Sequence, residues 1–428
     1  MPKRPQGGRR APARQMGLLA AAEAGRSTSA RIWVALIALG VAARFTLALL
    51  SIGSNDGAAW HRFGEEVSRF GLLRTYQIDP DFNHPPLPAY WAAAVVKIVG
   101  AGDDLGDIWI FSIVFKLPAI LADCAGICLL WQIWRGRIGR AGAWVVAALF
   151  ALSLDAILVS GYHCNTDPVF VSLCLLAVYL MEDRGRPFWG GFALGAAINV
   201  KIIPVLLVPP LLLSCRRWRD LAWFLAGMAP WVLPFLPPLV LAHEHFVDNA
   251  LSYNSVLDRW GVNFFVLFGR PAFNPNAPGG HFALWYYWHA RYLIVGWIGV
   301  WAVVARLAGR WGRYELAAVT FAIFLVLTPG FGVQYTVLVG LLLFAVRVDV
   351  ATVYGLVAGL FLGAVYAAFR VGGVPLYSEW RSLIPPVPAF LGLMTWLLLV
   401  YFLIGTLVRP IGPAAEAASI RPRPADAP

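Results

Sequence analysis

The chain has 428 residues, of which 59% are hydrophobic and only 13% are charged. Soluble globular domains are much less apolar, so this composition excludes a water-soluble protein and predicts an all-α polytopic membrane protein. The formal net charge of +11 does not indicate a nucleic-acid partner, because the basic residues lie in short hydrophilic breaks between apolar runs and are not interleaved with aromatic residues.

The N-terminal segment, 1–31, is basic and contains Pro and Gly, and no small-residue cleavage site follows the first apolar run. We interpret it as a disordered cytoplasmic tail that leads into an uncleaved first span, Ile32–Ser51. Residues 409–428 are expected to form a second cytoplasmic tail. If both ends lie on one side of the membrane, the number of crossings is even.

This parity decides how one ambiguous apolar run, Leu87–Val99, is interpreted. Cytoplasmic loops hold an excess of Lys and Arg, so the basic clusters should share the side of the N-terminus. The cluster around Arg137 would fall outside if both Leu87–Val99 and Ile108–Trp134 crossed the membrane. The shorter run contains Lys97 and opens with a proline turn, so we predict that it lies at the interface.

Residues 52–107 then form one long exterior loop that carries two surface helices. One of these helices is Leu87–Val99. The other is an amphipathic segment that precedes it and ends near Phe70. Its apolar residues recur at helical spacing, at Trp60, Phe63, Val67 and Phe70, while its other face holds His61, Arg62, Glu65, Glu66 and Arg69. We predict that both helices lie on the periplasmic surface of the membrane.

The remaining apolar runs bring the predicted number of transmembrane helices to about twelve. They are Ala141–Gly161, Val169–Leu180, Phe188–Asn199, Ile202–Leu213, Asp220–Leu241, Tyr292–Leu307, Leu316–Leu327, Val333–Val346, Thr352–Phe369 and Pro388–Val408. A second exterior loop, 243–291, is rich in aromatic residues. We expect residues 32–346 to form the functional membrane module and residues 347–408 to add C-terminal transmembrane helices.

Asp56 is the strongest candidate for a catalytic group, because it follows the first span in the sequence Ser54-Asn55-Asp56-Gly57. A carboxylate at this position has two interpretations. It caps the helix that begins near Ala58, or Ser54 or Asn55 provides the cap and Asp56 points into a site. In the second case, partial desolvation at the membrane surface is expected to raise the pKa of Asp56.

Other polar side chains are expected at the same exterior face, and polar groups that share one depth in an apolar protein suggest a site. They are His84, Lys116, His163, Asp167, Lys201, Gln334 and Tyr335, joined by Tyr253 and Trp260 of the second exterior loop. Snorkelling explains the two lysines equally well, and Asp167 before Pro168 also suits a helix cap. Asp123, inside a span, needs a buried partner, for which Arg44 is a candidate.

Several motifs, taken in order, resemble the GT-C superfamily of polyprenyl-phosphate-sugar-dependent glycosyltransferases. They are Asn55-Asp56-Gly57, Asn83-His84-Pro85-Pro86-Leu87, Phe115-Lys116-Leu117-Pro118, Asn199-Val200-Lys201 and Gln334-Tyr335. The resemblance is to eukaryotic dolichyl-phosphate-glucose-dependent glucosyltransferases and to bacterial polyprenyl-phosphate-mannose-dependent mannosyltransferases, and it covers most of 32–346. It implies a GT-C bundle in the bacterial inner membrane, with the active site facing the periplasm.

The resemblance further implies an inverting hexosyl- or pentosyltransferase that moves a sugar from a polyprenyl-phosphate carrier to a hydroxyl of a glycan or lipid acceptor. Asp56 would act as general base, Lys116 and Lys201 would bind the donor phosphate, and His84, His163, Asp167, Gln334, Tyr335, Tyr253 and Trp260 would contact substrate. His163 and Asp167 alone make an incomplete metal set, so no metal cofactor is expected. The alternative is a transporter or flippase for a lipid-linked or small sugar.

Overall fold

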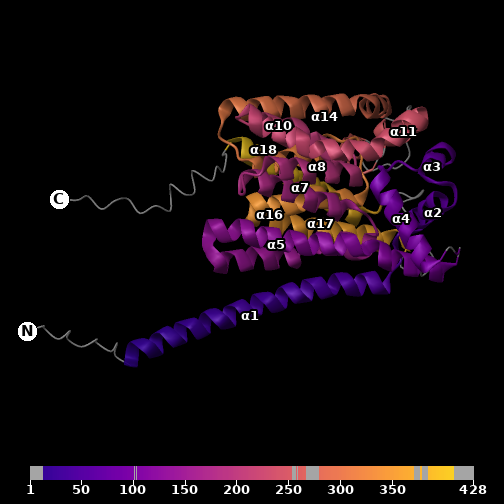
Figure 1. Cartoon of the computed structure of the whole chain (residues 1–428). Coiled ribbons are helices and arrows are strands. Elements are labelled where there is room, and N and C mark those ends of the chain that lie inside the picture. Colours follow the sequence, from indigo (N-terminus) through magenta and orange to yellow (C-terminus); the bar gives the residue numbers. More distant parts are fainter. Residues whose placement is uncertain are drawn as a thin grey trace, which may run out of the picture.

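The computed structural model describes residues 13–100, 102, 104–252, 257, 259–266, 279–370, 376–377 and 384–408, and this part of the chain is largely helical (Figure 1). Its α-helices are α1 (Ala13–Leu50), α2 (Asn55–Phe70), α3 (Leu72–Ile78), α4 (Pro86–Val99), α5 (Leu105–Ala151), α6 (Leu154–Leu158), α7 (Asp167–Glu182), α8 (Pro187–Val200), α9 (Val208–Ser214), α10 (Trp218–Met228), α11 (Leu236–Leu241), α12 (His243–Phe246), α13 (Val262–Val266), α14 (Gly280–Ala308), α15 (Arg313–Leu327), α16 (Val337–Val346), α17 (Val348–Ala368) and α18 (Pro386–Val408).

Short irregular elements connect these helices. Two π-helical turns, η1 (Val159–His163) and η4 (Val247–Leu251), and three 3₁₀ segments, η2 (Ile203–Leu207), η3 (Ala229–Phe235) and η5 (Val333–Thr336), interrupt the longer apolar runs. Strands β1 (Gly53–Ser54) and β2 (Leu376–Tyr377) pair in parallel, with Gly53 opposite Leu376. β1 therefore joins the segment after α1 to the segment that follows α17.

Six helical segments in the described part of the chain are long and apolar enough to cross a membrane. They are Ala30–Leu50, Leu105–Ala151, Trp218–Leu241, Gly280–Ala308, Val348–Ala368 and Pro386–Val408. Ile203–Ser214 and Val333–Val346 are apolar but shorter. A helical membrane protein is thus confirmed, whereas the count of about twelve crossings stays a prediction.

Helix α5 contains two of the predicted spans, because its backbone reverses at Gly139 (φ 80°, ψ 176°). Only glycine adopts this conformation without steric cost, so the turn occurs at a glycine. Gly139 lies within the basic cluster around Arg137 that the sequence shows. The second arm ends at Ala151, which is earlier than the predicted Gly161. The remainder of that predicted span is α6 followed by the π-helical turn η1.

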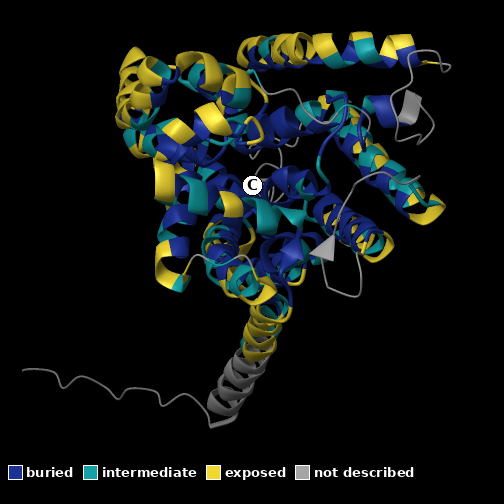
Figure 2. Ribbon diagram, turned by 90° about the vertical axis from the view of Figure 1, so that its right-hand side faces the viewer, coloured by how far each residue is buried: buried dark blue, intermediate teal, exposed yellow. Residues whose placement is uncertain are grey.

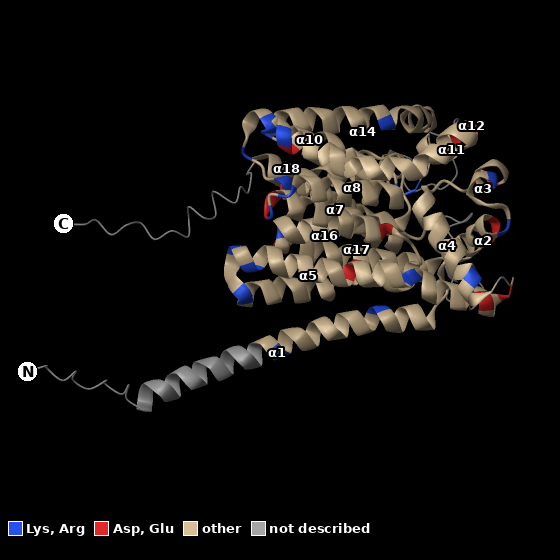
Figure 3. Ribbon diagram, in the orientation of Figure 1, with Lys and Arg blue, Asp and Glu red and all other residues tan. Residues whose placement is uncertain are grey.

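The bundle has two chemically different ends (Figure 3). Lys and Arg gather where α5 turns and where α10 begins, and the end of α18 lies there too (Figure 1); we call this the basic end. Helices α2, α3 and α4 cover the opposite end, which we call the α2–α4 end. Figure 2 shows buried residues at the centre of the bundle and exposed residues on the outer helices.

The core of the bundle is centred on α16, all of whose residues are buried. It packs against α5, α7, α15 and α17. A helix that is apolar on every side needs neighbours on every side, and the run of Val, Leu and Phe in α16 meets that condition. This rigid centre holds the ends of the surrounding helices in fixed positions.

The two amphipathic helices predicted in the first exterior loop are present as α2 and α4, and their apolar faces pack together in one cluster. Trp60, Phe63 and Val67 are buried as expected. Phe70 is 49% exposed, because α2 ends there at Gly71. His61 is buried against Phe111, contrary to its assignment to the polar face.

Two predicted boundaries differ from the structure. Helix α1 begins at Ala13, within the segment predicted to be a disordered tail, since the alanine-rich sequence before Ile32 favours helix. The segment predicted as a second exterior loop, 243–291, contains the start of α14, which follows the left-handed Gly279 (φ 83°). The predicted tail 409–428 lies outside the described residues.

Candidate active site

Asp56 lies at the start of α2, and the chain before it determines its position. Gly53 has φ +103°, and a Cβ atom there would approach the carbonyl oxygen of Tyr162 to 2.2 Å, so only glycine fits. Ser54 is the N-cap: its hydroxyl accepts a hydrogen bond from the Asp56 N–H (3.2 Å) and donates one to the carbonyl of His163 (2.6 Å). Since Ser54 caps the helix, the carboxylate of Asp56 does not.

The carboxylate of Asp56 is held through one of its two oxygens. Asn165 Nδ2 donates to Asp56 Oδ2 at 2.6 Å, and His163 Nε2 lies 3.2 Å from the same oxygen. The other oxygen, Oδ1, has no hydrogen-bond partner within the described part of the chain. The side chain is 26% exposed, so Oδ1 is accessible.

The expectation of a raised pKa at Asp56 is wrong. Burial raises the pKa of this carboxyl, but the contacts with His163 and Asn165 and the charge of Lys201 outweigh burial and bring it below its ordinary value. The carboxylate is therefore ionised throughout the neutral pH range. Its neighbours hold the side chain in place, and desolvation does not dominate its pKa.

His163 connects Asp56 to the opposite side of the bundle. While Nε2 faces Asp56, Nδ1 lies 2.8 Å from the hydroxyl of Tyr366 in α17. The chain then turns at Cys164, a non-glycine residue in the left-handed region (φ 67°), and this turn brings Asn165 to the same carboxylate. Strained backbone of this kind persists where the surrounding structure enforces it, which is common at functional sites.

Lys201 forms the second charged centre of the site. Its ammonium is 2.5 Å from Asp167 Oδ1 and 4.4 Å from the centroid of the Tyr335 ring. Helix α8 ends at Val200, and Lys201 is extended (φ −154°, ψ 145°), so the chain leaves the helix at this residue. The charge of Lys201 lowers the pKa of Asp56 and of His84, so both groups lie within its electrostatic reach.

His84 follows Asn83 in the extended segment before α4, and its ring packs against Trp60 with the centroids 4.2 Å apart. Tyr76 donates a hydrogen bond to its carbonyl oxygen (2.6 Å). Burial, with the charge of Lys201, lowers the pKa of His84 to about 3, so the imidazole is neutral at physiological pH. A neutral ring binds hydroxyl groups well but accepts a proton poorly.

The structure separates Lys116 from this cluster. Its ammonium is fully buried and donates to the carbonyl oxygen of Ser51 at 2.7 Å, directly after the end of α1. Lys116 thus supports the chain that leads to Asp56, and its role as a phosphate ligand stays a prediction.

Among the three other predicted substrate contacts, Gln334 and Trp260 form no hydrogen bond or ion pair with Asp56, His163 or Lys201 in the described part of the chain. Gln334 is half-buried and its side chain lies against Gly332. Trp260 is 2% exposed and packs against Phe361 in the main core. Tyr253 lies outside the described residues.

Two residues of the cluster were not selected from the sequence. Asn165 is part of the motif that contains His163 and Asp167, and its position between them was the available signal. Tyr366 carried no signal, because one hydroxyl within the apolar run of α17 looks like any interfacial tyrosine. In the part of the chain that the structure describes, no three His, Cys, Asp or Glu side chains are placed to hold a metal ion.

Comparisons with known proteins give a family match and two similar proteins. The family model "Glycosyltransferase family 87" matches residues 105–331, which is more than half of the chain. Undecaprenyl phosphate-alpha-4-amino-4-deoxy-L-arabinose arabinosyl transferase from Pseudomonas aeruginosa (strain UCBPP-PA14) is 28% identical over 205 residues, covering 43% of this chain and 36% of the relative. The match therefore spans little more than a third of that relative's length.

Among solved structures, the crystal structure of ArnT from Cupriavidus metallidurans bound to undecaprenyl phosphate is similar to this chain. The sequence identity is 16%, with 90% of this chain and 79% of that chain covered, and the TM-score is 0.38. A score of this size does not by itself show a shared fold. The family model is the stronger of these findings, because it covers the whole stretch from α5 to α15.

Proposed function

The chain belongs to glycosyltransferase family 87, within the GT-C superfamily of membrane glycosyltransferases, and from this membership we propose that it transfers a sugar from a polyprenyl-phosphate carrier to an acceptor hydroxyl. The acceptor is a lipid-linked glycan, a polysaccharide or a lipid. The proposed reaction is a single displacement that uses one base and one departing phosphate. A single displacement inverts the configuration of the anomeric carbon. The printed name of the Pseudomonas relative supports the class of donor.

One observation carries this proposal: Asp56 is held by Oδ2 while Oδ1 is free and accessible among the described residues. A general base must be oriented and must keep one lone pair for the proton that it removes. Oδ1 takes the proton of the acceptor hydroxyl while the acceptor oxygen bonds to the anomeric carbon. The bond from that carbon to the carrier phosphate breaks in the same step.

Lys201 is the better placed cation for the departing phosphate. An ammonium has three donors, and Asp167 uses one of them, so two remain for phosphate oxygens. The side chain is 10% exposed, and charge stabilisation is stronger in such a partly dehydrated site than in water. The leaving phosphate is a stable anion, so it needs this charge more than it needs a proton.

His84 and Tyr335 complete the proposed substrate site. Neutral His84 offers one donor and one acceptor to sugar or acceptor hydroxyls. The ring of Tyr335 is largely buried beside Lys201 and holds that ammonium at the edge of the proposed site. We propose that the site faces the periplasm, since positive-inside orientation places the basic end in the cytoplasm.

Transfer can be tested with the purified full chain and a panel of polyprenyl-phosphate-linked sugars, by following release of the polyprenyl phosphate together with glycosylation of added lipid acceptors. We expect release to depend on both donor and acceptor. Movement of an intact lipid-linked sugar across the bilayer without release would favour the transporter. Transfer from nucleotide sugars alone would contradict the proposed donor.

A further inference from the structure

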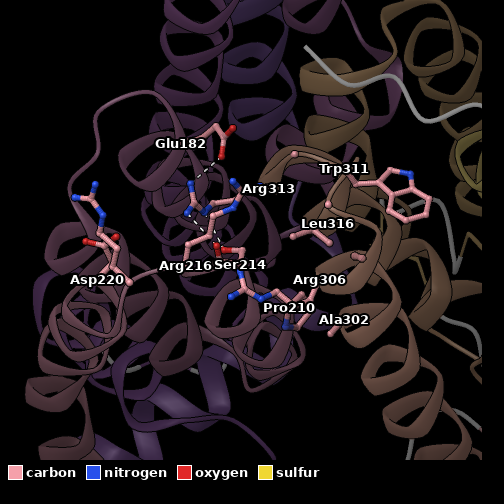
Figure 4. Close-up of a pocket in the computed structure, with 14 residues that line it drawn as sticks. Glu182, Pro210, Ser214, Arg216, Asp220, Ala302, Arg306, Trp311, Arg313 and Leu316 are labelled. Atoms are coloured by element: carbon pink, nitrogen blue, oxygen red, sulfur yellow. Dashed lines mark hydrogen bonds and ion pairs between the residues drawn. The ribbon is translucent and has the colours of Figure 1, made fainter. Parts of the chain in front are cut away.

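A cavity of about 400 Å³ lies at the basic end of the bundle, where α9 and α14 end and α10 and α15 begin (Figure 4). It is remote from Asp56. Helix α7 has 16 residues, about 24 Å at 1.5 Å per residue, and runs from Asp167 in the candidate active site to Glu182 in this cavity. The cavity therefore lies near the opposite surface of the membrane.

Arginines dominate the charge of this cavity. The charged residues of its lining are Arg216, Arg217, Arg306, Arg313, Glu182 and Asp220. Arg313 is already engaged: it donates to Glu182 Oε2 and to Ser214 Oγ, both at 2.9 Å, as the dashed lines in Figure 4 show. Since that pair neutralises Glu182, three arginines face Asp220 alone.

Among the described residues, those three arginines have no protein partner for their charge. Within the described residues, the guanidinium groups of Arg216, Arg217 and Arg306 form no ion pair and no side-chain hydrogen bond. Guanidinium groups bind phosphate oxygens in a fixed fork geometry, and several around one concavity favour an anion there. The cavity thus suits a phosphate group.

An apolar groove of about 340 Å³ lies beside the cavity, between α14, α15 and α18. Its lining is entirely hydrophobic or aromatic and includes Trp301, Val304 and Leu407. Trp311 links the two spaces. It lines the cavity, packs 4.9 Å from Trp301 of the groove, and donates to the carbonyl of Thr406 at 3.1 Å.

We propose that the cavity and the groove together bind one anionic glycerophospholipid, with its phosphate among Arg216, Arg217 and Arg306 and one acyl chain in the groove. A free phosphate ion accounts for the cavity but leaves the adjoining groove unexplained. A zwitterionic lipid brings its own cation to a site that already has an excess of positive charge. An anionic lipid matches both surfaces.

The full chain, purified in detergent, can be tested for binding of dioleoyl-phosphatidylglycerol, dioleoyl-phosphatidylcholine and inorganic phosphate by native mass spectrometry and by thermal unfolding. We expect phosphatidylglycerol to bind with the highest affinity and to raise the unfolding temperature. The triple variant Arg216→Gln, Arg217→Gln, Arg306→Gln should lose about tenfold or more of that affinity.

A matched control removes the same number of charges from the same end of the bundle. Arg140, Arg186 and Arg219 are exposed and line neither the cavity nor the groove, so their replacement by Gln should leave binding within about twofold of wild type. Val304→Trp, which fills the groove, should weaken phosphatidylglycerol but not phosphate.

Three outcomes would overturn the proposal. Equal losses in the two triple variants would indicate diffuse surface charge and no built site. Unchanged phosphatidylglycerol binding in Val304→Trp, with phosphate competing for the site, would indicate a free phosphate site. Equal affinity for phosphatidylcholine and phosphatidylglycerol would show that the three arginines do not select an anionic lipid.

Discussion

His163 Nε2 lies 3.2 Å from Asp56 Oδ2, and this contact joins the start of α2 to the end of the π-helical turn η1. The two residues come from different predicted loops, yet they define the geometry of the proposed base. The contact leaves Oδ1 free among the described residues and contributes to the lowered pKa of Asp56.

The pH dependence of transfer should reflect this contact. Because the pKa of Asp56 is below its ordinary value of 3.8, protonation of Asp56 should not reduce kcat/KM as the pH falls from 8 to 5. His163→Gln removes a contact that lowers the pKa, while burial, which raises it, remains. The acidic limb should therefore move to higher pH.

Tyr366→Phe is the control for that measurement. It removes the hydroxyl that contacts His163 Nδ1 but keeps the imidazole of His163, which contacts Asp56. It should move the acidic limb much less than His163→Gln does. An identical limb in wild type and His163→Gln would show that Asp56 is not the group that titrates.

Substitutions at Lys201 and Asp167 should distinguish an effect on the stability of the protein from an effect on sugar transfer. Lys201→Gln leaves the buried carboxylate of Asp167 without its partner, which should cost about 3 kcal/mol of stability and raise KM for the donor. The double variant Lys201→Gln, Asp167→Asn should regain most of the stability, since neither charge remains. Thermal unfolding and donor titration measure the two effects.

Transfer should stay low in that double variant, because the cation proposed to bind the phosphate is still missing. Recovery of transfer together with stability would mean that Lys201 has a structural role only.

Lys116 should behave differently from Lys201. Its ammonium holds the carbonyl of Ser51, so Lys116→Gln should disturb the segment that positions Asp56 and lower kcat by about tenfold with little change in donor KM. The two kinetic constants distinguish the roles. A large rise in donor KM would instead support the phosphate-binding role inferred from the sequence.

Gly53→Ala should abolish transfer, because the added Cβ would approach the carbonyl oxygen of Tyr162 to 2.2 Å and displace the segment before Asp56. Gly71→Ala is a matched control at the same end. Gly71 also has positive φ (+80°), but nothing lies within 4 Å of its Cβ position, so only conformational strain of roughly 1–3 kcal/mol is expected. Similar activities of the two variants would contradict a steric role for Gly53.

Local features of this protein could be predicted from its sequence because they depend on neighbouring residues. The helices α2 and α4 follow from apolar spacing and a proline turn, and the turn in α5 follows from the basic cluster around Gly139. The pairing of Asp123 with Arg44 is confirmed at 2.7 Å, because a buried carboxylate in an apolar helix has few cations to choose from.

The assembly of the site was not predictable in the same way. The meeting of Asp56 with His163 and Tyr366 depends on how η1 packs between α1 and α17, which no local pattern records. The sign of the pKa shift at Asp56 was missed for the same reason, since desolvation is visible in sequence and hydrogen-bond partners are not.

The central claim, that Asp56 is the general base, is tested most directly by Asp56→Asn in the transfer assay with a polyprenyl-phosphate-linked sugar. Asn keeps the size of the side chain but cannot accept the proton, so transfer should fall by about 10²-fold or more while the unfolding temperature changes little. Asp81→Asn, at an exposed carboxylate of the α2–α4 end, should transfer sugar as wild type does. Near-normal transfer by Asp56→Asn would contradict the assignment.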